Sequence, residues 1–124
     1  MWHRKLWIIS CLLLVSGIAL GAFAAHGLTQ TLSASALHTL QTGVQYQMYH
    51  GLGLLALSLC RDCNGRAYHL GTRLLLFGVV LFSGSLYALS LSGQSWFGMI
   101  TPIGGVAFIL GWGCLLFSAP PRQE

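Results

Sequence analysis

Charged side chains are scarce in this chain of 124 residues. Six basic and two acidic residues make up only 6% of it, against about a quarter in ordinary soluble domains. A soluble protein of this length must cover a large surface with polar groups, and so few charges do not suffice. Because 55% of the residues are hydrophobic, the composition predicts one integral membrane domain over residues 1–124 that contacts the lipid bilayer.

Acidic residues are nearly absent, and neither Asp62 nor Glu124 lies in an apolar stretch. A small exporter of the four-helix multidrug type would need a carboxylate inside the membrane, so acid-coupled transport is disfavoured. The basic residues do not form a cluster with interleaved aromatics, which argues against a nucleic-acid partner. The chain therefore offers no charge-based signal for either activity.

Motifs that hold metals or phosphates are incomplete. Cys60 and Cys63 form a C-x-x-C pair, but no second pair follows, and His69 is the one extra ligand nearby. We therefore expect free thiols rather than a metal or redox site. Gly104 and Gly105 lack the Lys and Ser/Thr of a phosphate loop. No catalytic residue, metal or cofactor is expected.

Four long apolar stretches follow one another along the chain. Residues 6–27 are uncharged and span about 33 Å as a helix, enough for a hydrocarbon core of about 30 Å. Ser33 or Ser35 is expected to cap the second helix, and Thr101 to cap the fourth. We predict an all-α, four-helix transmembrane bundle with antiparallel neighbours, whose spans cover residues 6–27, 36–60, 69–92 and 102–119.

The basic residues predict the orientation. With four spans, every Lys and Arg lies on or beside the side that holds both termini and the middle loop. The positive-inside rule assigns that side to the cytoplasm. An alternative is a cleaved secretory signal, because the small residues Ala22 and Ala24, on either side of Phe23, follow a basic and apolar segment. Three spans with the same loop sides would then be left.

The second predicted helix carries polar residues at membrane depth. At 100° per residue, Gly43, Tyr46, Gln47 and His50 lie within about 100° of one another. Lipid provides no partner for such groups, so they must find partners within protein. An adjacent face carries a second polar stripe, formed by His38, Gln41, Thr42, Gln45 and Tyr49.

The rise of a helix places two pairs at equal depth. Counting from the basic residues at the helix ends, His50 and Ser83 both lie about 15 Å into the membrane, near its midplane. By the same count Tyr87 is level with Gln47. We predict the pairs His50–Ser83 and Gln47–Tyr87 between the second and third helices, with Ser85 beside them.

Four motifs occur in order along nearly the whole chain: Gly21-Ala22-Phe23-Ala24-Ala25-His26; Gln41-Thr42-Gly43 with Tyr46-Gln47 and His50; Phe82-Ser83-Gly84-Ser85-Leu86-Tyr87; and Thr101-Pro102-Ile103-Gly104-Gly105. In these motifs the chain resembles the YgdD-type family of small four-span bacterial inner-membrane proteins, which has eukaryotic relatives. The resemblance implies that the first helix is retained and brings no established activity. Ala24 departs from the Gly expected there.

Two interpretations of the polar cluster are open. In the first, the cluster holds the helices together, and the protein is a non-enzymatic interaction or assembly component that forms a homo-oligomer or joins a larger membrane complex. In the second, His50, Gln47 and Tyr87 bind a quinone or haem in an electron-transfer subunit. His26 and His38 form a candidate pair at the outer interface. Small residues are expected to allow close helix packing, namely Gly17, Gly21, Ala25, Gly84, Gly104 and Gly105.

Overall fold

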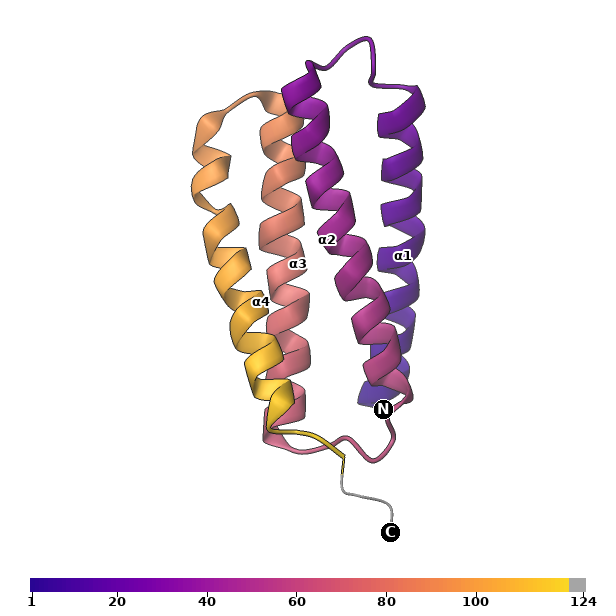
Figure 1. Ribbon diagram of the computed structural model, residues 1–124. Helices are drawn as coiled ribbons and strands as arrows, with labels where there is room; N and C mark the ends of the chain where they lie inside the picture. The colour runs from indigo at the N-terminus through magenta and orange to yellow at the C-terminus, as the bar shows by residue number, and fades with distance from the viewer. Residues whose placement is uncertain (121–124) are drawn as a thin grey trace.

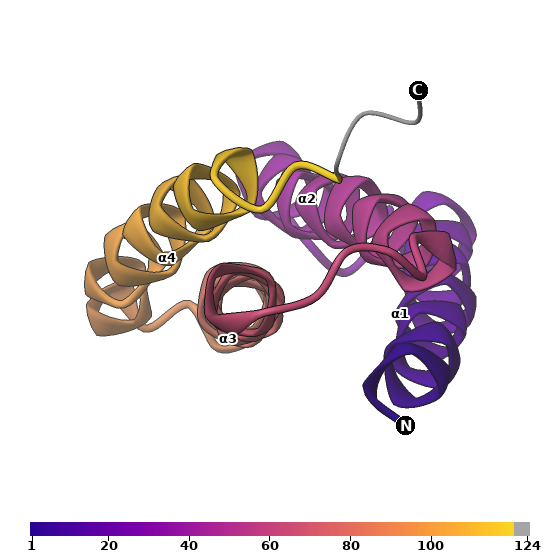
Figure 2. The same cartoon turned by 90° about the horizontal axis from the view of Figure 1, so that it is seen from below.

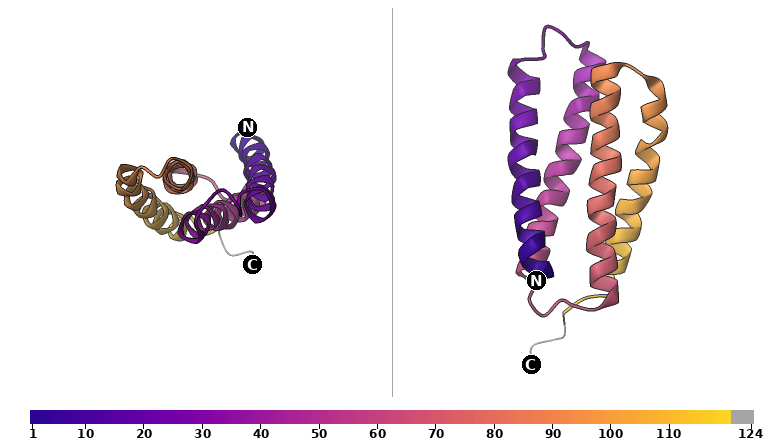
Figure 3. Two further views of the ribbon diagram at one scale, coloured as in Figure 1. Left: turned by 90° about the horizontal axis from the view of Figure 1, so that it is seen from above. Right: turned by 180° about the vertical axis from the view of Figure 1, so that it is seen from behind.

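A computed structural model describes residues 1–120 of the chain, and within this range the secondary structure is entirely helical. The long helices lie side by side (Figure 1). The connections after α1 and α3 lie at one end of the molecule, and the connection after α2 lies at the other end with the N-terminus (Figure 3). The elements are α1 (Trp2–His26), α2 (Ala34–Leu59), α3 (Arg66–Ser92), the 3-10 helix η1 (Ser95–Met99) and α4 (Thr101–Leu116).

Three of these helical segments are long and apolar enough to cross a membrane. They are Trp2–His26, Arg66–Ser92 and Ser95–Leu116. Helix α2 is as long as its neighbours, with 26 residues, but it falls outside this set. Its glutamines and histidines lower its mean hydropathy, so the helix with the most polar residues lies between two apolar ones.

The helices pack in chain order rather than as a closed ring. Helix α1 packs on α2, α2 on α3, and α3 on α4, whereas the backbones of α1 and α4 stay apart within residues 1–120. Figure 2 shows α4, α2 and α1 along an arc, with α3 on its concave side. Helix α2 therefore has one face toward its neighbours and another toward the outside.

The helix ends agree closely with the sequence-based expectation, with one correction. Ser33 caps α2 by accepting a hydrogen bond from the backbone nitrogen of Ala36 at 3.1 Å. The predicted cap Thr101 is wrong, because Ile100 holds the N-cap position of α4. The Thr101 hydroxyl instead lies 2.6 Å from that of Ser85 and joins α4 to α3.

Close packing of α3 on α4 depends on two pairs of glycines spaced seven residues apart. A Cβ on Gly71 would lie 2.9 Å from the Gly111 carbonyl oxygen, and one on Gly78 would lie 3.1 Å from that of Gly104. The backbones therefore approach where side chains are absent. Of these four glycines, only Gly104 was predicted from the sequence to pack closely.

The remaining expectations about small residues have mixed outcomes. Gly17 and Gly21 face α2, where added Cβ atoms would lie 2.7 Å from Met48 Sδ and 3.4 Å from a Val44 methyl group. A Cβ on Gly105 would lie 3.9 Å from the Phe82 ring. The expectation was wrong for two positions, since Ala25 is exposed and Gly84 is open to its surroundings.

Candidate functional site

Gln47 joins three helices. Its side chain is only 4% exposed, and its amide nitrogen donates to the Leu13 carbonyl and to the Ser16 hydroxyl of α1, both at 2.8 Å. Its amide oxygen accepts a hydrogen bond from the Tyr87 hydroxyl of α3 at 2.6 Å. The predicted Gln47–Tyr87 pair is thereby confirmed. The bonds to α1 were missed, because the depth count was applied to the second and third helices and not to the first.

Ser83 bonds to the backbone of α2 rather than to His50. Its hydroxyl donates to the Gly43 carbonyl oxygen at 2.6 Å. This approach is possible because Gly43 has no side chain, and a Cβ there would lie 2.8 Å from the Tyr87 ring. The predicted His50–Ser83 pair is therefore wrong. The depth estimate set His50 and Ser83 level, whereas the Ser83 hydroxyl bonds at Gly43, which precedes His50 by about two helical turns along α2.

His50 is a buried hydrogen-bonding residue, as expected, but its partner across the helices is on α4 rather than α3. Its Nδ1–H donates to the Tyr46 carbonyl oxygen at 2.8 Å, and its Nε2 accepts from the Trp112 indole N–H at 3.2 Å. A carbonyl only accepts and an indole N–H only donates. These partners therefore select the neutral tautomer that carries its proton on Nδ1.

Aromatic rings enclose the imidazole. The Phe108 ring stacks on His50 with centroids 3.6 Å apart and planes inclined by 10°. Sequence reasoning missed Phe108 and Trp112, although a Trp within a membrane helix is itself a signal. Its N–H needs an acceptor at that depth, and a neutral imidazole provides one.

A groove of about 550 Å³ opens beside this stack. Its wall is largely aromatic, and His50 contributes an edge that is already hydrogen-bonded at both ring nitrogens. Such a shape suits a flat, apolar ring more than a metal ion. No group of three or more metal-ligating side chains lies within residues 1–120. The residues that line the groove are Tyr46, His50, Phe82, Gly105, Phe108, Ile109 and Trp112.

The outward stripe of α2, which we define as His38, Gln41, Gln45 and Tyr49, has few partners. All four side chains are exposed, and Tyr49 is 54% exposed. The Gln45 amide donates to the Tyr49 hydroxyl within the same helix. The structure does not join His38 to His26, which is also exposed, by any hydrogen bond or ring contact in the described part of the chain.

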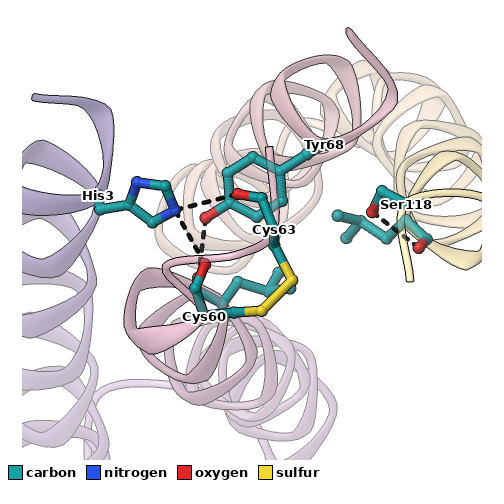
Figure 4. The surroundings of a disulfide bond; sticks show 7 residues. His3, Cys60, Cys63, Tyr68 and Ser118 are labelled. Carbon is teal, nitrogen blue, oxygen red and sulfur yellow. Dashed lines mark hydrogen bonds between the residues drawn. A yellow bond between two sulfur atoms is a disulfide. The ribbon is translucent and has the colours of Figure 1, made fainter. Parts of the chain in front are cut away.

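Cys60 and Cys63 form a disulfide, which corrects the expectation of free thiols. That expectation rested on the lack of a second C-x-x-C pair, whereas the turn after α2 brings the Cα atoms of Cys60 and Cys63 to 5.3 Å, within bonding range. His3 Nε2–H donates to the carbonyl oxygens of both cysteines, at 3.0 and 3.2 Å, as Figure 4 shows. The His3 ring also stacks on Tyr68, so the first turn of α1 is anchored to this connection.

The fold defines a small all-α protein with helices apolar enough to cross a membrane. The chain belongs to the family described as "Protein of unknown function (DUF423)", whose family model matches residues 20–105. Together with the similarity to the Escherichia coli protein YgdD, this match confirms the expected resemblance to the YgdD-type family.

The chain is similar to curated relatives from several bacteria. The "UPF0382 membrane protein SSP2132" of Staphylococcus saprophyticus is 47% identical over 85% of this chain and 88% of the relative. The "UPF0382 membrane protein" of Haemophilus influenzae is 44% identical over 82% of each chain. The "UPF0382 inner membrane protein YgdD" of Escherichia coli is 41% identical over 82% of this chain and 79% of the relative. No solved structure matches the chain.

Proposed function

We propose that the protein is a non-enzymatic assembly component of a bacterial inner membrane, in which it forms a four-span antiparallel domain and associates with another membrane protein or a second copy. The printed names of its relatives support the location, since the Escherichia coli relative is named an inner membrane protein. Large apolar side chains exposed on α1, α3 and α4 support contact with lipid, as at Val15, Val80 and Ile109.

The buried polar side chains of α2 all have hydrogen-bond partners, which supports α2 as the fourth span. Helix α2 lies between α1 and α3 in the packing order, and a polar helix is tolerated in lipid when its polar groups bond to neighbouring helices. Within residues 1–120 no buried side-chain nitrogen or oxygen lacks a hydrogen-bond partner. In this proposal, α2 spans the membrane because it packs against its neighbouring helices.

The distribution of basic residues supports cytoplasmic termini. Arg4 and Lys5 lie near the N-terminus, and Arg61 and Arg66 near the α2–α3 connection. Arg122 lies outside the described residues. Reporter fusions in the connection 27–33 and at the C-terminus are expected to lie on opposite sides of the membrane, and equal signals from both would contradict four spans.

The outward stripe carries the proposal of an assembly role. Gln41 and Gln45 are exposed on a helix whose neighbours leave this face open. By the rise of the helix, Gln45 lies about 7 Å from the level of His50, well inside the hydrocarbon core. An amide offers both donors and an acceptor, and at this depth another protein meets those needs whereas lipid does not.

Replacement of the stripe amides tests this role. The particle mass of the wild type in mild detergent, and its photobleaching steps in vesicles, are expected to indicate an assembly larger than the monomer. The Q41L/Q45L variant should dissociate to monomers that keep their helical content. Q30L is the matched control, because Gln30 is exposed in the connection after α1. A monomeric wild type with no co-purifying membrane protein would contradict the proposal.

A second candidate function rests on the aromatic groove. Its aromatic walls suit a quinone-like ring, and the Tyr46 hydroxyl is a polar group at its edge that forms no side-chain hydrogen bond within residues 1–120. Haem is favoured less, because iron would have to displace Trp112 from His50 Nε2. The test is to add a short-chain quinone to the purified protein. Saturable binding that is weakened in Y46F would support this function, and binding that is equal in Y46F would contradict it.

A further inference from the structure

Two arginines from different segments border one pocket of about 460 Å³ at the basic end of the molecule. Arg4 belongs to the first turns of α1, and Arg61 follows the end of α2. Both side chains are exposed. Arg122 and Glu124 lie outside the described residues. The other five basic residues and the other acidic residue all lie near the N-terminus or the α2–α3 connection, at this end of the molecule. Positive charge therefore dominates this end.

The same pocket has an apolar side. Trp7 and Leu59 line it and are 45% and 64% exposed. Trp7 lies near the start of α1, close to Arg4, and Leu59 lies at the end of α2, close to Arg61. At both places a membrane helix meets the lipid–water boundary. Trp and Tyr are enriched at this boundary. The pocket thus presents cationic groups toward water and apolar side chains toward the hydrocarbon.

We propose that this pocket binds the phosphodiester headgroup of an anionic glycerophospholipid. A guanidinium donates two parallel hydrogen bonds to phosphate oxygens, and two of them from separate segments can hold one phosphate. Basic pockets between helices at the membrane surface recognise anionic headgroups in this way. A zwitterionic lipid brings its own ammonium group close to the two arginines, so the anionic lipid is preferred. The acyl chains extend along Trp7 and Leu59.

Lipid selectivity of the full-length protein tests this assignment. Native mass spectrometry in mild detergent would compare bound phosphatidylglycerol with bound phosphatidylcholine of the same acyl chains. The wild type is expected to prefer phosphatidylglycerol at least about tenfold, because each basic residue at the surface contributes severalfold to anionic-lipid binding. The R4Q/R61Q variant should lose that preference. The K5Q/R66Q variant removes the same charge from neighbouring positions that do not line the pocket, and it should keep most of it.

Free phosphate shares the oxygen chemistry of the headgroup, and a separate arm distinguishes the two. Inorganic phosphate at the lipid concentration should not displace phosphatidylglycerol, because it makes no contact with Trp7 and Leu59. Displacement would assign the pocket to phosphate and overturn the lipid proposal. An equal loss of preference in both double variants would overturn it too. If R4Q/R61Q does not fold, the single variants R4Q and R61Q should each lose about threefold, and no change in either would overturn the proposal.

Discussion

The two polar stripes of α2 differ in where their hydrogen bonds go. On the inward side, Gln47 and His50 bond to α1, α3 and α4 and are almost fully buried. On the outward side, Gln45 bonds within its own helix, and it is exposed together with Gln41 and Tyr49. The residue types are similar, so polarity in a membrane helix does not reveal its role. What distinguishes the stripes is whether a neighbouring helix of the same chain lies close enough to bond.

Glycines on the inward side allow the difference. A Cβ on Gly43 would meet the Tyr87 ring, and one on Gly51 would lie 3.0 Å from Leu14 of α1. Neighbouring helices therefore approach this face closely. The outward stripe has no glycine among its four residues, and its bonds stay within α2.

The largest expected loss of stability comes from placing a large side chain on the inward face of α2. Replacing Gly43 with Leu should push the Tyr87 ring away and disrupt both the Ser83–Gly43 and the Gln47–Tyr87 bonds. We expect a destabilisation of about 3 kcal/mol, at the upper end for overpacking a core. Unfolding in mixed micelles measures the free energy. The matched control is G84L, because Gly84 is open to its surroundings, and an equal loss in that variant would contradict the packing argument.

Gln47→Leu should be the next most disruptive change. It removes three hydrogen bonds to two helices, each worth about 0.6 kcal/mol on average in a membrane protein. The three bonds together give an expected loss of about 2 kcal/mol. Gln45→Leu, one stripe away, should change the stability of the monomer by less than about 0.5 kcal/mol. Similar unfolding free energies for the two variants would show that the stripes do not differ.

The coupling energy of the His50–Trp112 hydrogen bond should be smaller than these losses but still measurable. H50L and W112F each remove one partner, and the double variant completes a thermodynamic cycle. We expect a coupling energy of about 1 kcal/mol, within the range found for hydrogen bonds between membrane helices. The chemical shift of the indole N–H in wild type and H50L gives an independent readout. A coupling energy near zero, with an unchanged chemical shift, would show that the His50–Trp112 bond does not stabilise the inward stripe.

The smallest effect on folding should come from the outer histidines. His26 and His38 are exposed near the connection after α1, so H26A/H38A should alter stability by less than about 0.5 kcal/mol. Zinc titration followed by calorimetry tests the outer pair separately. Saturable binding in the wild type that is absent in the double variant would show that these residues do more than face the surface.

Features that depend on distance along one helix were predictable. The helix ends agree to within a few residues, and the Gln47–Tyr87 pair is confirmed, because rise per residue converts sequence separation into depth. The His50–Ser83 pair was wrong in depth as well as in direction, because the Ser83 hydroxyl bonds at Gly43, about two helical turns before His50. Depth does not state which of several neighbours a side chain faces, and Phe108 and Trp112 of α4 occupy the side of His50 that α3 was expected to fill.

Composition by itself determined that the chain is apolar enough for lipid, because eight charges cannot cover a soluble surface of this size. The length of the uncharged stretches indicated that they are helices. Periodicity determined that α2 has two polar stripes. Only the tertiary structure decided which stripe is satisfied, because that depends on how the helices rotate and how closely their backbones approach. The Gly71–Gly111 and Gly78–Gly104 contacts place α4 against α3, and this placement brings Trp112 to His50. The same packing order leaves the other face of α2 open, where Gln41 and Gln45 are exposed.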